Sequence, residues 1–252
     1  MQKSRLGKER TDTVKIIGHR GAAGYAPENT LASMKTAYEQ GCDGIEFDVQ
    51  LTKDHEVVVI HDWTVDRTTN GSGEVKDLTL KEIRKLDAGS WFGPDFTGER
   101  VPTLEEVFAA FPKEFLLNVE IKVQGYDHRP IEDKVLKIIE AHDRREHTVV
   151  SSFHNLRIKN FMELSRKIDT ALMFEGYLPQ IPPTEFFGGK ISSFHPSKDY
   201  VDENLVKKAR AQDLKVYVWT VNDLNYLKRL QKIGVDGIIT NYPSYMLKHL
   251  QE

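Results

Sequence analysis

The stretch DGIEFDVQLTKDHEVVVIHD, residues 43–62, contains two apolar runs rich in β-branched residues, 43–50 and 57–62. Each run has the composition of a buried strand. Only about six residues separate them, whereas a parallel crossover needs about a dozen or more, so the two runs are predicted to form an antiparallel hairpin. With Asp54 and His55 as a two-residue turn, Asp48 faces His61 across the hairpin.

Seven further runs of the same kind recur along the chain, and segments with helical periodicity separate most of them. These runs are 15–20, 115–122, 148–153, 170–174, 189–194, 215–221 and 236–240. The alternation indicates an α/β fold whose sheet is parallel. Without the hairpin strand, eight parallel strands remain, so we expect a (β/α)8 TIM barrel with an antiparallel hairpin arm. An open doubly wound sheet has the same alternation and is the alternative.

Two segments between the strands carry expectations of their own. The first helix is predicted to follow Asn29, a residue type that often caps helices, and to end at Gly41. The segment 62–104 interrupts the alternation and is dense in Gly, Asp and Thr, with one short helical stretch at 80–86. Insertions of this length after a strand end are usually functional or cover a site, a decorative surface excursion being the alternative.

The composition excludes several classes of protein. A formal net charge of −3 over 252 residues favours neither nucleic acid nor an anionic membrane as a partner. The single Cys42 excludes an intrachain disulfide. No run of about 18 apolar residues is present, so no membrane span is expected. The basic first ten residues are followed by no apolar region, so we expect no secretory signal and a cytoplasmic protein. The oligomeric state is not indicated.

Charged side chains gather at the predicted carboxyl ends of strands, where α/β folds place their chemistry. These residues are His19, Arg20, Glu46, Asp48, His61, Glu120 and Lys122. Isolated ionised groups in apolar strands cost on the order of several kcal/mol, so the group is expected to form one site. Three carboxylates together with an arginine and a lysine would complement a cation and a phosphate.

The three carboxylates, Glu46, Asp48 and Glu120, offer only oxygen ligands. Such a set favours a hard divalent cation, Mg²⁺ or Ca²⁺. The alternative is a salt-bridge network, with Glu46 paired to Arg20 for example.

The remaining members of the group suit a phosphate and proton transfer. Arg20 would bind phosphate oxygens bidentately and Lys122 as a point charge. Two histidines, His19 and His61, allow one to act as base and the other as acid. We favour His19 as the base.

Several motifs resemble the glycerophosphodiester phosphodiesterase family of bacterial type. They are HRG…PENT (19–30), EFDVQLTKD (46–54), VVIHD…RTT (58–69), VEIK (119–122), VWTVN (218–222) and DGIITNYP (236–243). The resemblance runs from Ile16 to about Pro243 with the motifs in family order. It implies a barrel of residues 1–252 with one divalent cation. It also implies hydrolysis of glycerophosphodiesters, such as glycerophosphocholine or glycerophosphoethanolamine, to sn-glycerol 3-phosphate and an alcohol.

The resemblance also implies residue roles. The acid/base pair would be His19 and His61, the metal ligands Glu46, Asp48 and Glu120, and the phosphate contacts Arg20 and Lys122. The insertion 62–104 would cap the site and hold the glycerol end. One departure is the hairpin turn Lys53-Asp54-His55, which usually ends in Gly in this family.

Three further residues have two interpretations each. Trp219 and Phe153 would either stack on the glycerol moiety or pack on the barrel. Glu28 would either support the metal site or belong to the helix start.

Other activities fit part of the pattern. A metal-dependent lyase or aldolase could use the same residue types, and a non-catalytic phosphodiester-binding barrel or a lysophospholipase D-type enzyme are further alternatives. The nucleophile is either water or the glycerol hydroxyl of the substrate, which would give a cyclic phosphate first.

Overall fold

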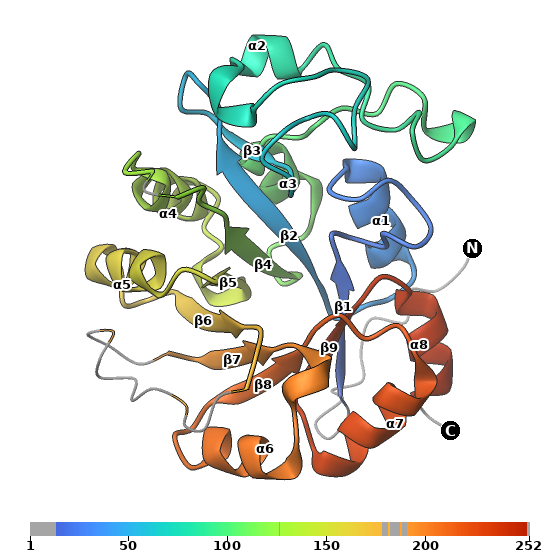
Figure 1. Cartoon of the computed structure of the whole chain (residues 1–252), viewed down its shortest axis with the longest axis vertical. Helices are drawn as coiled ribbons and strands as arrows, with labels where there is room; N and C mark the ends of the chain where they lie inside the picture. The colour runs from blue at the N-terminus through green and yellow to red at the C-terminus, as the bar shows by residue number, and fades with distance from the viewer. Residues whose placement is uncertain (1–13, 126, 178–180, 182–186, 188–190, 251–252) are drawn as a thin grey trace.

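In the computed structural model, which describes residues 14–125, 127–177, 181, 187 and 191–250, one sheet of nine strands surrounds the centre of the molecule (Figure 1). Eight strands are parallel, and pairing of β1 with both β9 and β2 closes them into a barrel. The strands are β1 Lys15–His19, β2 Gly44–Leu51, β3 Val57–Val59, β4 Leu116–Ile121, β5 Thr148–Ser152, β6 Asp169–Phe174, β7 Ser193–Pro196, β8 Lys215–Val218 and β9 Gly237–Thr240. The predicted TIM barrel is confirmed.

Helices surround the barrel on its outer side, except for α2 (Leu80–Ile83) in the segment 62–104, which lies beyond the hairpin arm (Figure 1). They are α1 Leu31–Glu39, α2 Leu80–Ile83, α3 Leu104–Ala110, α4 Ile131–Ala141, α5 Asn155–Leu164, α6 Glu203–Arg210, α7 Leu224–Ile233 and α8 Pro243–His249. Short 3₁₀ turns are Val75–Asp77, Pro94–Phe96, Arg145–His147 and Lys198–Tyr200. No helix in these described ranges has the length and apolar composition needed to cross a bilayer.

Alternation along β2 separates the core from the site. Ile45, Phe47 and Val49 belong to the large apolar core in which the strands pack against the helices. Glu46 and Asp48 therefore lie on the opposite, inner face of the strand.

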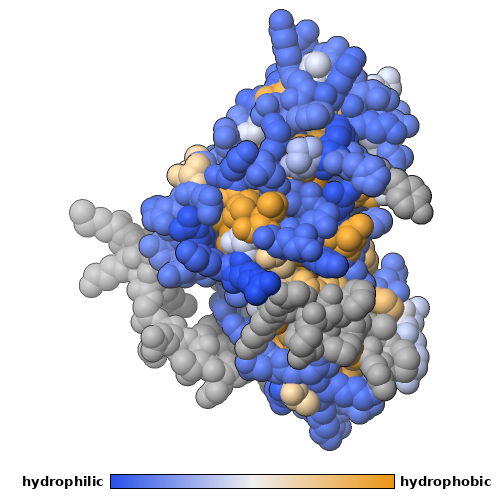
Figure 2. Space-filling view, turned by 90° about the vertical axis from the view of Figure 1, so that its left-hand side faces the viewer, coloured by the Kyte–Doolittle hydropathy of each residue, from blue (hydrophilic) through white to orange (hydrophobic). Residues whose placement is uncertain are grey.

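The surface on the left of Figure 1 is largely hydrophilic, and its apolar area is divided into separate patches (Figure 2).

The hairpin arm exists, but its register differs by one residue from the prediction. Val49 pairs with Val59, and the Ile60 amide donates to the Asp48 carbonyl at 3.0 Å, so Asp48 faces Ile60 rather than His61. The loop has three residues, 53–55, because His55 adopts a left-handed conformation with φ +63°. Such a residue closes a three-residue hairpin loop, which shifts the pairing by one position.

Two other predicted boundaries were wrong. Asn29 does not cap α1, because the side chain of Thr30 accepts the capping hydrogen bond from the Ser33 amide. Of the strand expected at 189–194, residues 189–190 lie outside the described residues. The observed strand, β7, extends beyond the predicted end to Pro196. His195 consequently lies inside a strand and is buried.

The segment 62–104 builds a small apolar core of its own on the outer end of the hairpin arm. This core consists of Val58, Ile60, Val65, Val75, Ile83, Ala88 and Val101. In Figure 1 the segment lies at the top, beyond β3 and beside α1. The hairpin arm thus attaches the segment to the barrel next to the carboxyl end of β2.

Candidate active site

Three carboxylates from two neighbouring strands converge at one end of the barrel. Strand pairing places Asp48 of β2 directly beside Glu120 of β4, and Glu46 lies two residues before Asp48 on the same face. Each side chain offers an oxygen atom, and these atoms all lie within 4.8 Å of one another. All three residues are at most 5% exposed. A buried, all-oxygen donor set of this kind fits Mg²⁺ or Ca²⁺.

The electrostatics of the carboxylates favour a bound cation. Burial, together with the charges of Asp48 and Glu120, raises the pKa of Glu46 well above its usual value. Burial and the charge of Asp48 raise the pKa of Glu120 to about 7. Burial also acts on Asp48, but Arg20 and Lys122 outweigh it and hold the pKa of Asp48 below its usual value. A divalent cation would relieve this mutual repulsion.

The two predicted phosphate-binding cations lie against these carboxylates. The Nζ atom of Lys122 is 3.2 Å from Glu120 Oε1 and 3.6 Å from Asp48 Oδ1. The Nε atom of Arg20 is 3.3 Å from Asp48 Oδ2, and its Nη1 donates to Glu28 Oε1 at 2.7 Å. Glu28 therefore belongs to the site through its contact with Arg20.

Asn29 is a site residue that was not predicted from the sequence. Its Nδ2 donates to Asp48 Oδ2 at 2.9 Å, and its Oδ1 accepts from the Asp48 amide at 3.3 Å. The backbone of Asn29 is left-handed, with φ +58°, a conformation that Asn tolerates better than most residues. This tight turn directs the Asn29 side chain toward Asp48 on β2. The sequence feature that could have indicated this role is the position of Asn29 in the PENT motif.

His19 lies at the end of β1 beside Glu46. Its Nδ1 is 2.6 Å from Asn241 Oδ1, and its Nε2 is 3.9 Å from Glu46 Oε2. An amide oxygen accepts, so Nδ1 carries the proton and Nε2 has a free lone pair. Burial and the neighbouring Arg20 lower the pKa of His19 to about 4, which keeps the ring neutral at pH 7. Asn241 was not predicted as a site residue, although the motif DGIITNYP contains it.

His61 is held from the other side by an acidic neighbour. Its Nδ1 lies 2.7 Å from Asp62 Oδ1, so Nδ1 donates to a carboxylate. Burial lowers the pKa of His61 despite the opposing effect of Asp48. The ring is therefore anchored through Nδ1, which leaves Nε2 free for proton transfer.

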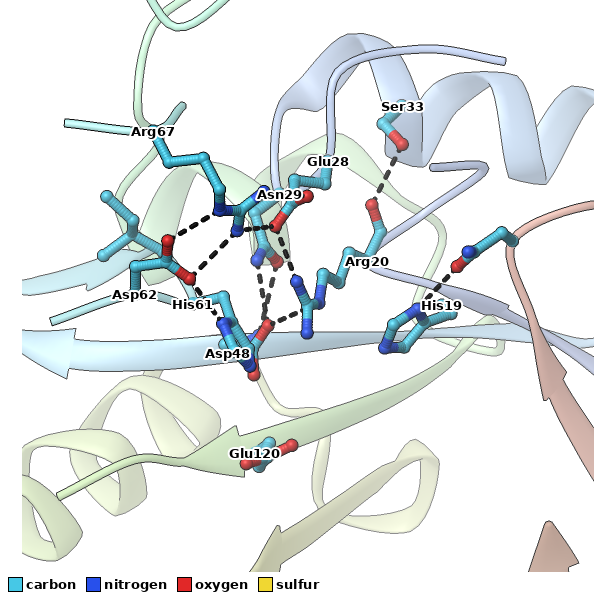
Figure 3. Close-up of polar contacts among 12 residues, drawn as sticks. His19, Arg20, Glu28, Asn29, Ser33, Asp48, His61, Asp62, Arg67 and Glu120 are labelled. Carbon is cyan, nitrogen blue, oxygen red and sulfur yellow. Dashed lines mark hydrogen bonds and ion pairs between the residues drawn. The ribbon is translucent and has the colours of Figure 1, made fainter. Parts of the chain in front are cut away.

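A chain of ion pairs connects His61 with Arg20 (Figure 3). Arg67 donates to Asp62 from Nε at 2.6 Å and from Nη2 at 2.9 Å. It also donates to both carboxylate oxygens of Glu28, each at 2.8 Å. The roles of Asp62 and Arg67 were not predicted, since these residues meet their partners only when the insertion folds back toward α1.

Five of the seven charged residues predicted at strand ends, His19, Arg20, Glu46, His61 and Glu120, line one side of a cleft of about 250 Å³. The residues that line it are His19, Arg20, Glu46, His61, Glu120, Phe153, Met173, Glu175, Trp219, Thr220 and Ile239. Trp219 and Phe153 thus lie in the cleft, and their rings meet edge to face with centroids 5.3 Å apart. In the described part of the chain, the segment 62–104 approaches the site through Asp62 and Arg67 and through the Trp63 ring, 5.7 Å from Lys122 Nζ.

Comparison with known proteins shows which family and which solved structures this chain resembles. The model of the glycerophosphoryl diester phosphodiesterase family matches residues 19–245. A glycerophosphodiester phosphodiesterase of Caldanaerobacter subterraneus is 43% identical over 92% of this chain and 96% of that protein. One from Bacillus subtilis is 34% identical over 94% and 86%, respectively. An Oleispira antarctica phosphodiesterase, solved with the product sn-glycerol-3-phosphate, superposes with a TM-score of 0.89 at 28% identity, covering 95% of this chain and 98% of that one.

Proposed function

The chain belongs to the glycerophosphoryl diester phosphodiesterase family and has the hydrolase activity of that family, and we propose that it releases sn-glycerol 3-phosphate from substrates such as glycerophosphocholine and glycerophosphoethanolamine. We propose further that the reaction requires Mg²⁺ or Ca²⁺ and two histidines. The observation that carries this proposal is the convergence of three buried carboxylates within 4.8 Å, two of which, Glu46 and Glu120, line the same cleft as His19 and His61.

In this proposal Glu46, Asp48 and Glu120 hold the divalent cation. When bound there, the cation would neutralise phosphate charge and polarise the phosphorus centre. Asn29 contributes by fixing the position of the Asp48 carboxylate through the two hydrogen bonds described above.

Arg20 and Lys122 bind the phosphate oxygens. Both side chains are largely buried, with 17% and 12% exposed, so their charges are only weakly screened at the cleft. They stabilise the negative charge that builds on the phosphate oxygens in the transition state.

The two histidines, His19 and His61, transfer protons during the proposed reaction. His19 is neutral at pH 7 and has its Nε2 free, which suits a general base that takes the proton from the nucleophile. His61 gives a proton to the departing alcohol from its protonated form, in which Nδ1–H donates to Asp62 and Nε2–H is transferred, so that the neutral ring remains. Phosphorus-31 NMR of the reaction distinguishes the two nucleophiles, because attack by the glycerol hydroxyl produces a transient cyclic phosphate and attack by water does not.

The test is release of glycerol 3-phosphate from glycerophosphocholine by the purified protein. We expect turnover that EDTA abolishes and that added Mg²⁺ or Ca²⁺ restores. Binding of glycerophosphocholine without turnover would instead indicate the non-catalytic barrel. Release of choline from lysophosphatidylcholine alone would indicate a lysophospholipase D-type enzyme, and turnover of 2-oxo acids a lyase or aldolase.

A further inference from the structure

The cleft has a second wall that the proposed chemistry does not use. It is formed at the carboxyl ends of β5, β6 and β8, where Phe153, Glu175 and Trp219 each follow their strand closely. The cation-binding carboxylates lie instead on β2 and β4. One wall is therefore charged and polar, and the other combines two aromatic rings with a single carboxylate.

The aromatic corner is held in place and open to the cleft. The Trp219 indole Nε1 donates to the His195 carbonyl at 2.7 Å, which fixes the orientation of the ring. Phe153 meets Trp219 edge to face, with an interplanar angle of 83°, and is nevertheless 40% exposed. A large aromatic side chain that is ordered by a neighbour but left this exposed has surface available for a ligand.

Glu175 brings a negative charge to the same wall. Glu175 is exposed, and no hydrogen bond or ion pair involves it within the described residues. A carboxylate beside aromatic rings attracts an organic cation, since the rings present their negative faces and the carboxylate supplies the countercharge. Among the described residues that line this wall, none is cationic.

We propose that this wall selects phosphodiesters whose second alcohol carries an ammonium group, with Glu175 as the specificity-determining residue and Phe153 and Trp219 as the aromatic surface. This inference rests on the proposed function, because it takes the phosphate to be held at the opposite wall by Arg20 and Lys122. The alcohol then extends across the cleft, so that its cationic end reaches the aromatic corner.

The test compares one cationic and one neutral substrate. For the wild type and Glu175→Gln, kcat/KM is measured on glycerophosphocholine and on glycerophosphoglycerol. We expect the ratio of the two values to fall about fivefold in Glu175→Gln, the upper range for an exposed ion pair, and further in Glu175→Lys. Glu163→Gln is the matched control, since Glu163 is exposed near the end of α5, and it should leave the ratio unchanged.

Two results would overturn the inference. If kcat/KM fell equally on both substrates, Glu175 would contact the glycerol arm that they share. If kcat/KM changed on neither substrate, the wall would not discriminate between headgroups. Thermal unfolding of each variant shows whether its fold is retained. If the wild type hydrolysed neither substrate, the proposed function would fail, and calorimetric binding of glycerophosphocholine to the wild type and Glu175→Gln would still test the wall by itself.

Discussion

The substitution Asp62→Asn tests whether the Asp62 carboxylate orients the His61 ring for proton transfer, because it leaves His61 itself unchanged. The Asp62 carboxylate accepts from His61 Nδ1 and Arg67 Nη2 on one oxygen, and from Arg67 Nε on the other. An amide offers only one oxygen. With that oxygen toward Arg67 Nε, the amide NH₂ faces His61 Nδ1, which can accept only in the neutral ring, so the protonated form of His61 that gives its proton to the leaving group is disfavoured. With the oxygen toward His61, the NH₂ faces the Arg67 donor.

The structure sets the size of the effect. A hydrogen bond to a charged group contributes about 1.5–3 kcal/mol. The His61 and Asp62 side chains are 32% and 28% exposed, so the lower end of that range applies. About 1.5–2 kcal/mol corresponds to a loss in kcat of about 10- to 30-fold. KM should stay nearly constant, because His61 acts on the leaving group rather than on the ground-state phosphate.

The assay couples glycerol 3-phosphate release to NADH formation by glycerol-3-phosphate dehydrogenase. Asp66→Asn is the matched control, since Asp66 lies in the same segment and accepts from the Gly73 amide at 3.0 Å, a bond that an amide oxygen can also accept. It should retain wild-type kcat. Wild-type kcat in Asp62→Asn, with an unchanged unfolding midpoint, would refute the positioning role of Asp62.

Three other outcomes are expected. His19→Ala and His61→Ala should each lower kcat by about 10²–10⁴ in the same assay, and near-wild-type turnover in both would contradict the acid/base assignment. Mg²⁺ or Ca²⁺ at about 100 times its Kd should raise the free energy of unfolding by about 2.7 kcal/mol over the EDTA-treated protein, and Glu46→Gln should lose this gain, as followed by thermal denaturation. Asn29→Gly should unfold at a lower temperature than the wild type, and Asn29→Ala at a still lower one, because only glycine adopts φ +58° without strain; the reverse order would contradict this reasoning.

The candidate site could be predicted to the extent that local spacing encodes it. Glu46 and Asp48 are two residues apart in an apolar strand, so they share a face whatever the rest of the chain does. Glu120 and Lys122 repeat the pattern at the end of β4, the next parallel strand of the barrel. Because carboxyl ends of parallel strands meet at one end of a barrel, these pairs had to converge.

The sequence by itself determined the alternation of strands and helices, the hairpin arm and the strand-end residues, because each depends on periodicity over a few neighbouring residues. Tertiary structure decided the one-residue register at His55, the left-handed turn that brings Asn29 to Asp48, and the pairing of His19 with Asn241, 222 residues away. It also decided that Arg67 joins Asp62 to Glu28. These contacts depend on backbone conformation and on the approach of distant segments, which hydrophobic periodicity does not encode.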